Sequence, residues 1–277
     1  MRLGGQIFKN YSDPHTWAAA VKEMGYRAAY CPVKPGTETE IIDAYAAAAR
    51  EADIIIAEAG AWSNPLDADP EKREKAMEFC KQSLELADRI DASCCVNIAG
   101  SRGSKWDGPA AADLLDETFD MIVEITQEII DAVNPRRTFF TLETMPWMLP
   151  DSVDSYLQLI RAINRKSFGV HLDPVNLITG PRLYYHNTAL LKECFARLGA
   201  YIKSCHTKDI ILRDNYTVHL DEVLPGQGTL DYPTYLRELA GLEKDVPLMI
   251  EHLPDEASYR QAARYITSVA EKEKLKF

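Results

Sequence analysis

The sequence predicts a single (β/α)₈ barrel that extends over residues 1–277, and three observations lead to this fold class. Short apolar segments alternate along the chain with longer segments of helical periodicity. Several short segments, such as CCVNI at 94–98 and FFTLE at 139–143, are apolar on both faces, as parallel strands covered by helices are. A length of 277 residues suits one barrel, and no linker or internal repeat divides the sequence.

The expected strands are short, apolar and rich in β-branched, aromatic or small residues. Each precedes a polar or glycine-containing segment where a loop can begin. In chain order they cover Leu3–Phe8, Arg27–Cys31, Asp53–Ala57, Ala92–Ile98, Thr138–Glu143, Phe168–Leu172, Ile202–His206 and Pro247–Glu251.

A helical segment follows each expected strand. Good start signals come before two of them, Ser12-Asp13 and Pro150-Asp151-Ser152. The third combines Glu/Lys pairs on one face with apolar residues on the other. The expected helices are Pro14–Met24, Glu38–Glu51, Pro70–Arg89, Asp113–Ala132, Asp151–Ile163, Asn187–Leu198, Tyr232–Leu239 and Asp255–Lys272. Eight strand–helix units in succession are the pattern of a (β/α)₈ barrel.

Charge and composition argue against several classes of partner. The formal net charge is −11, which disfavours a protein that neutralises nucleic-acid phosphates. No segment approaches 18 consecutive apolar residues, so no membrane span is expected. The N-terminal segment lacks the apolar core of a signal peptide, and the six cysteines form no CxxC pair. These features predict a cytoplasmic protein with reduced thiols.

Four consecutive strand ends carry side chains that can bind a metal ion. Glu143, Asp173, His206 and Glu251 end or directly follow the last four expected strands. Alone, a carboxylate in such a place often caps a turn or forms a salt bridge, and a lone histidine is often a core residue. Together, three carboxylates and one imidazole favour Mn²⁺, Mg²⁺ or Co²⁺ over an ion that prefers thiolates. A cation would also relieve the repulsion between the carboxylates.

At these residues the sequence resembles the sugar phosphate isomerase/epimerase group of the xylose isomerase-like TIM barrel superfamily. The resemblance covers essentially the whole chain. Its most specific segments are LETMPW (142–147), VHLDPVNL (170–177), SCHTKDI (204–210), PGQGTLDY (225–232) and MIEHL (249–253). It implies that Glu143, Asp173, His206 and Glu251 hold one divalent metal ion, with Mn²⁺ the expected ion and Mg²⁺, Co²⁺ or Zn²⁺ as alternatives.

The resemblance also implies an isomerase or epimerase that acts on a sugar or sugar derivative. A metal that binds the substrate carbonyl and the adjacent hydroxyl acidifies the neighbouring C–H bond. One glutamate would remove that proton to give a metal-bound enediolate, and the other would return a proton. Glu143 and Glu251 are the candidates for this catalytic pair.

Further residues are candidates for contact with a sugar-like substrate. The indole rings of Trp62, Trp106 and Trp147 can stack on sugar C–H surfaces or simply fill the barrel mouth. Lys208 and Arg213 can bind a hydroxyl or phosphate, or be solvated loop charges. The other candidates are Glu58, Asn97, Asn176, His219 and Glu222. The glycines of the GQG segment predict a tight turn, because the helix-opening spacing of a phosphate-binding loop is absent.

One departure from the relatives bears on the metal. Many have Asp-x-x-His after the sixth strand, whereas this chain has Asn176 at the fourth position. Together with Asn97 and a total of six histidines, this disfavours the three-zinc site of an endonuclease IV-type DNA-repair enzyme.

Two other functions also agree with the sequence. A metal-dependent dehydratase or lyase of a keto-sugar or inosose, including one that cleaves C-glycosides, would need the same ligands. A non-catalytic sugar-binding barrel needs none of them. The substrate, the native metal and the possibility of a homo-oligomer are not decided by the sequence.

Overall fold

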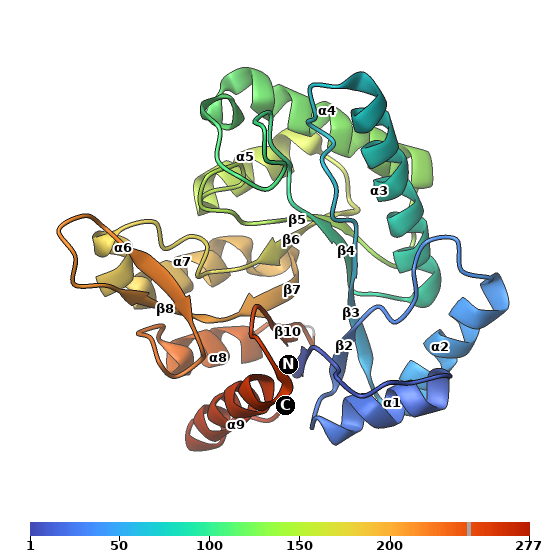
Figure 1. Ribbon diagram of the computed structural model, residues 1–277, viewed down its shortest axis with the longest axis vertical. Helices are drawn as coiled ribbons and strands as arrows, with labels where there is room; N and C mark the ends of the chain where they lie inside the picture. The colour runs from blue at the N-terminus through green and yellow to red at the C-terminus, as the bar shows by residue number, and fades with distance from the viewer. Residues whose placement is uncertain (243–244) are drawn as a thin grey trace.

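The computed structural model describes residues 1–242 and 245–277, and within them eight parallel strands close into a barrel (Figure 1). Their order around the barrel is β1-β10-β7-β6-β5-β4-β3-β2. The barrel strands are β1 (Arg2–Gly5), β2 (Ala28–Tyr30), β3 (Ile55–Gly60), β4 (Cys94–Asn97), β5 (Phe140–Glu143), β6 (Phe168–Leu172), β7 (Ile202–Thr207) and β10 (Pro247–Ile250). The predicted (β/α)₈ fold class is confirmed.

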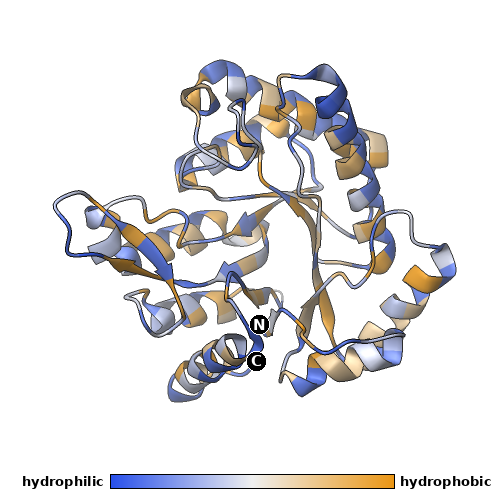
Figure 2. Cartoon of the chain, in the orientation of Figure 1, coloured by the Kyte–Doolittle hydropathy of each residue, from blue (hydrophilic) through white to orange (hydrophobic). Residues whose placement is uncertain are grey.

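Helices surround the strands and turn their apolar faces inward (Figures 1 and 2). Side chains cap several of them. Asp13 and Ser152 each form a capping box, which satisfies backbone N–H groups of the first helical turn. The helices are α1 (Pro14–Glu23), α2 (Thr39–Glu51), α3 (Pro70–Ile90), α4 (Asp116–Val133), α5 (Val153–Ile163), α6 (Pro181–Tyr185), α7 (Asn187–Leu198), α8 (Tyr232–Ala240) and α9 (Glu256–Lys272).

Two predicted boundaries are wrong for identifiable reasons. The third strand was expected from Asp53, but Asp53 adopts a positive φ of 55° and its carboxylate binds Arg2 and Arg27. It therefore forms a turn, and β3 starts at Ile55. The fourth helix was expected from Asp113. That residue lies instead in a 3₁₀ turn (Ala111–Leu114), where its carboxylate accepts hydrogen bonds from Ser101 Oγ and the Arg102 N–H.

The sequence did not predict the short helix α6. It also did not predict the antiparallel hairpin between β7 and α8, which is formed by β8 (Asp209–Leu212) and β9 (Leu220–Val223). The Asp209 carboxylate lies at the base of this hairpin, where it accepts the N–H groups of Gly226, Gly228 and Leu230 as well as that of Ile210. The GQG segment is thus a turn, as the sequence predicts. The turn wraps around the Asp209 carboxylate, which was not predicted.

Apolar residues from both the strands and the helices form the core. The six cysteines take no part in a disulfide within the described residues, and all except the half-buried Cys31 are buried. Of the helices in the described ranges, none has both the length and the apolar character needed to cross a membrane.

Candidate metal centre

Four neighbouring strands deliver the four expected ligands to one place. Glu143 is the last residue of β5, His206 lies in β7, and Asp173 and Glu251 directly follow β6 and β10. Because these strands are adjacent in the barrel, their ends meet. One ligand atom from each side chain lies within 4.8 Å of the others. All four residues are buried, the most exposed being Glu251 at 7%.

The imidazole of His206 lies between the two glutamates. Its Nδ1 is 3.1 Å from Glu143 Oε1 and 2.9 Å from Glu251 Oε2. Burial lowers the pKa of His206, but the surrounding carboxylates outweigh it and raise the pKa well above its ordinary value. In the absence of a metal the ring is therefore an imidazolium ion that partly neutralises its neighbours.

Lys208 supplies a second positive charge. Its Nζ is 2.5 Å from Glu251 Oε1 and 2.7 Å from Asp173 Oδ2, and the side chain is 1% exposed. Burial disfavours the ammonium, yet Asp173 and Glu251 outweigh it and raise the pKa of Lys208 well above its ordinary value. The sequence left a solvated loop charge open for Lys208, and its burial excludes that reading.

One carboxylate oxygen of Asp173 accepts backbone hydrogen bonds, and the other only faces the ammonium group of Lys208 among the described residues. Its Oδ1 accepts the N–H groups of Val175 (2.9 Å) and Asn176 (3.3 Å). Its Oδ2 is buried and accepts no hydrogen bond from the described residues, although it forms the ion pair with Lys208. Burial raises the pKa of Asp173 to about 6 against the effect of Lys208, and two nearby glutamates add to the rise.

The donor set fits a divalent cation. The group holds three buried carboxylates and an imidazole, and one Asp173 oxygen accepts no hydrogen bond from the described residues. The raised pKa of Asp173 marks an excess of negative charge that Lys208 alone does not balance. Oxygen and imidazole ligands suit Mn²⁺ or Mg²⁺. Glu143, Asp173, His206 and Glu251 are the residues that would hold the ion.

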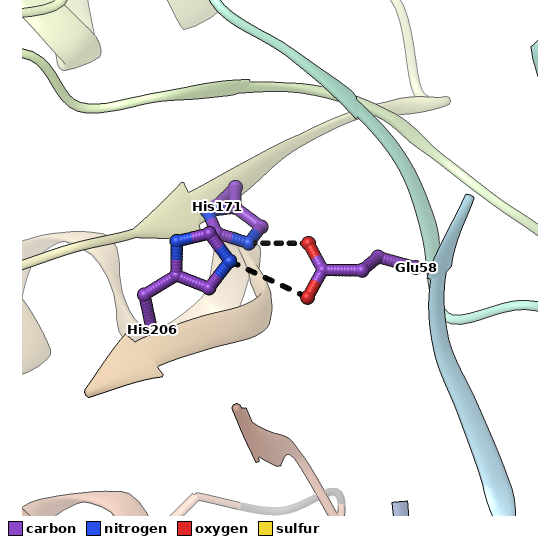
Figure 3. A group of neighbouring side chains, drawn as sticks. All are labelled: Glu58, His171 and His206. Carbon is purple, nitrogen blue, oxygen red and sulfur yellow. Dashed lines mark hydrogen bonds and ion pairs between the residues drawn. The ribbon is translucent and has the colours of Figure 1, made fainter. Parts of the chain in front are cut away.

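A second buried group shares His206. Glu58 on β3 has Oε2 2.8 Å from His171 Nε2 and Oε1 3.5 Å from His206 Nε2 (Figure 3). The two imidazole rings are in edge-on contact, with centroids 4.2 Å apart. Burial opposes ionisation of Glu58, but the two imidazoles prevail and lower its pKa to about 2. From the sequence, Glu58 is among the candidates for contact with a substrate, and no role is assigned to His171.

A cavity of about 770 Å³ opens beside this group. Glu58, His206 and Glu251 line its polar side, and the aromatic residues include Tyr30 and Trp62. Trp62 is 44% exposed, and its indole lies across Gly60, where a Cβ atom would overlap the ring. Of the two predicted catalytic glutamates, Glu251 lines the cavity and Glu143 does not, as far as the described residues show.

Two other predicted residues, Asn176 and Glu222, lie close to the centre. Asn176 Nδ2 donates to Glu143 Oε1 (3.3 Å) and to the Thr144 carbonyl (3.0 Å). Glu222, on β9, has Oε2 3.5 Å from Lys208 Nζ and 3.1 Å from His252 Nδ1. Trp147 is half-buried and packs against the core. The unpredicted hairpin thus carries Glu222 to the metal-ligand group.

The remaining candidates lie elsewhere, outside the lining of the cavity in the described ranges. Asn97 is buried, and its amide binds Ser63 and the Cys80 sulfur. Trp106 is 36% exposed on the β4–α4 loop. Arg213 pairs with Asp221, and His219 bonds to Thr217; all four belong to the exposed hairpin. Trp106, Arg213 and His219 follow the correct strands, but the length of their loops carries them away from the centre. Asn97 ends β4 itself, and its amide is taken up by the contacts with Ser63 and Cys80.

Comparison with known proteins agrees with this architecture. A closed parallel barrel with metal-competent side chains at the carboxyl ends of its strands defines a broad class of proteins. The model of the xylose isomerase-like TIM barrel family matches residues 18–269. The chain therefore belongs to that family. A search of curated proteins finds no significant match.

Several solved structures share the fold at low sequence identity. D-psicose 3-epimerase from Clostridium cellulolyticum H10, in a complex with D-tagatose, is 15% identical with a TM-score of 0.71, and all of both chains is covered. The probable 3-DHS dehydratase from Bacillus anthracis is 18% identical with a TM-score of 0.70, over 98% of its length and 97% of this chain. A xylose isomerase-like TIM barrel protein from Mycobacterium smegmatis, in a complex with magnesium, is 15% identical with a TM-score of 0.67, over 90% of its length and 95% of this chain.

Proposed function

We propose that this protein is a divalent-metal-dependent isomerase or epimerase of a sugar or sugar derivative. One observation carries the proposal: the carboxylates of two buried glutamates, Glu143 and Glu251, both contact the Nδ1 atom of His206. Such a pair can hold a cation and also move a proton beside it. The family membership and the sugar epimerases among the structural neighbours support the substrate class.

The metal would be held by Glu143, Asp173, His206 and Glu251. Once bound, it would polarise a substrate carbonyl and make the adjacent C–H bond more acidic. We propose Mn²⁺ as the native ion. A neighbour in complex with magnesium supports a site for a hard cation without selecting between Mn²⁺ and Mg²⁺.

The two glutamates differ in a way that suggests their roles. Burial disfavours ionised Glu251, but His206 and Lys208 outweigh it and hold the pKa of Glu251 well below its ordinary value. Glu251 is therefore a carboxylate at neutral pH, and it lines the cavity where a substrate would enter. We assign it the removal of the proton. Glu143, fixed by the Asn176 amide, would return a proton to the substrate.

The test measures exchange at carbon rather than product alone. Ketoses and keto-sugars are incubated in D₂O with Mn²⁺-loaded protein, and deuterium uptake next to the carbonyl is followed by mass spectrometry. Glu251→Gln and Glu143→Gln should each reduce uptake to the background rate. Glu117→Gln, which alters an exposed salt bridge to Arg102, is the control and should exchange like the wild type. Exchange at the wild-type rate in both site variants would contradict the proposal.

A dehydratase or lyase is the second candidate, and the buried Lys208 favours it. An ammonium group between Asp173 and Glu251 could stabilise a departing hydroxide or alkoxide near the metal-ligand group. The same mass spectra separate the two functions. Loss of water or of an aglycone from the deuterated substrate indicates elimination, whereas an intact isomer of the substrate indicates isomerisation or epimerisation.

A further inference from the structure

We propose that Glu58, held in place by His171, orients His206 and strengthens its bond to the metal ion. This inference rests on the proposed metal centre, but it concerns residues outside the four-ligand group. Glu58 and His171 would be positioning residues that act through His206. They come from β3 and β6, and His206 belongs to β7, so β3 meets two strands from the other side of the barrel at one imidazole ring (Figure 3).

The first step is the orientation of the His206 ring. Its Nδ1 faces Glu143 and Glu251, whereas its Nε2 faces Glu58 Oε1 at 3.5 Å. A histidine that binds a metal through one nitrogen commonly directs the other N–H to a carboxylate. That partner fixes the tautomer and the ring direction, and it makes the ligand nitrogen a stronger donor. Glu58 is the carboxylate that faces Nε2, and the separation of 3.5 Å has to shorten slightly for a direct hydrogen bond.

The second step is what holds Glu58. His171 is fully buried, and its Nε2 is 2.8 Å from Glu58 Oε2. Its Nδ1 has no hydrogen-bond partner among the described residues. A buried N–H without a partner is costly, so the hydrogen belongs on Nε2, where Glu58 accepts it. His171 therefore donates its one ring N–H to Glu58 and holds that carboxylate in place.

The third step is that stability alone does not explain a charge at Glu58. The carboxylate is 2% exposed, and its Oε1 accepts no hydrogen bond from the described part of the chain. Removing a charge from water is unfavourable, and a buried ion pair often adds no more stability than apolar residues of similar volume would. A buried carboxylate that faces two imidazoles is better explained by what it does to the ring of His206.

The experiment measures metal affinity, which does not depend on knowing the substrate. Chelator-treated protein is titrated with MnCl₂ in a calorimeter. Glu58→Gln should bind Mn²⁺ about 10–100-fold more weakly than the wild type, because outer carboxylates contribute to affinity on that scale. Thr141→Val is the matched control, since Thr141 is buried on β5, the strand next to β6, and donates to the Cys95 carbonyl rather than to the group around His206. Its Mn²⁺ affinity should equal that of the wild type.

Substitutions of His171 test the positioning role itself. His171→Gln retains an N–H donor near the place of Nε2 and should bind Mn²⁺ almost as the wild type does. His171→Leu removes the donor and should resemble Glu58→Gln. The double variant with both Glu58→Gln and His171→Leu should lose little more than either single variant, because the two residues act on one ligand. In Co²⁺-loaded protein, Glu58→Gln and His171→Leu should also shift the visible d–d absorption.

The outcomes separate this inference from the proposed function. If wild-type protein binds no Mn²⁺, the metal centre itself is wrong. If the wild type binds Mn²⁺ and folded Glu58→Gln binds it equally well, only the role of Glu58 is wrong. If the wild type binds two ions per chain and Glu58→Gln binds one, Glu58 is a ligand of a second cation and the positioning role is overturned.

Discussion

The two halves of the barrel mouth are built from different chemistry. Strands β5, β6, β7 and β10 end in the buried group Glu143, Asp173, His206 and Glu251. The ends of β1 to β4 carry Gly5, Tyr30, Gly60 and Asn97, which are uncharged. The cavity lies mainly along the uncharged half formed by β1 to β4, and it borders the charged half at His206 and Glu251. Under the proposed function, one half would bind a cation and move protons, while the other would shape the space for a substrate.

Glu58 is the exception to this division. It belongs to β3, in the uncharged half, yet its carboxylate reaches His171 and His206 in the charged half. Strand β3 therefore serves both halves: Glu58 contacts the metal-ligand group, and Gly60 lets the Trp62 ring lie against the cavity wall.

The largest expected effect belongs to the charged half. Glu251→Gln should lower kcat by roughly 10²–10⁴-fold, the usual contribution of a positioned acid or base. The measurement is steady-state turnover of whichever sugar shows deuterium exchange, at saturating Mn²⁺. A change confined to KM would mean that Glu251 only binds substrate, and the contrast between the halves would break down.

The pH dependence of metal binding should be the next largest effect. Metal ligands must give up their protons. The pKa of His206 is raised well above its ordinary value and that of Asp173 is raised to about 6. Metal binding must therefore displace a proton from His206 throughout the range from pH 7.5 to 5.5, and Asp173 also becomes protonated as the pH falls through about 6. Mn²⁺ affinity should decrease by roughly 100-fold or more over this range, as measured by calorimetry. Affinity that is independent of pH would mean that these residues are not the ligands.

The uncharged half should affect binding of substrate more than its conversion. Trp62→Ala removes an aromatic surface from the cavity and should raise KM by roughly 5–30-fold, equivalent to about 1–2 kcal/mol of contact, with little change in kcat. Trp106→Ala is the control, because Trp106 lies outside the cavity lining in the described ranges and is similarly exposed. Equal effects of the two substitutions on KM would assign the substrate to a different surface.

The smallest effect concerns stability without metal. The pKa of Asp173 is about 6 in the folded protein, against 3.8 ordinarily, so the folded state holds its proton more tightly than the unfolded state. The resulting destabilisation is full above pH 6 and absent below 3.8. Asp173→Asn should therefore stabilise the chelated protein at pH 8 by about 1–3 kcal/mol, raising Tm by a few degrees, and have little effect at pH 4. A lower Tm for Asp173→Asn at pH 8 would show that the ion pair with Lys208 dominates.

The sequence predicts the ligand group well because the rule behind it is local. A polar residue at the carboxyl end of a buried strand must lie at the barrel mouth, so Glu143, Asp173, His206 and Glu251 could be placed together once the strands were recognised. The roles of these residues stay proposals until metal binding is measured.

Contacts across the barrel could not be predicted in this way. The pairing of Glu58 with His171 depends on which side chains meet inside a closed sheet, and the spacing of the sequence carries no record of it. The burial of Lys208 depends on a hairpin that interrupts the regular alternation of strands and helices. The same hairpin carries Arg213 and His219 away from the cavity, although both follow β7 closely in sequence.

Asp209 has a consequence for engineering this protein. Because its carboxylate gathers backbone N–H groups from the turn at Gly226–Leu230, both ends of the hairpin are anchored at their base, next to Lys208. The tip at 213–219 includes the fully exposed Tyr216, and the ion pair of Arg213 and the hydrogen bond of His219 that the described residues show both stay within the hairpin. An added peptide tag or a dye-bearing cysteine at the tip should therefore leave the metal-ligand group undisturbed and report from its edge.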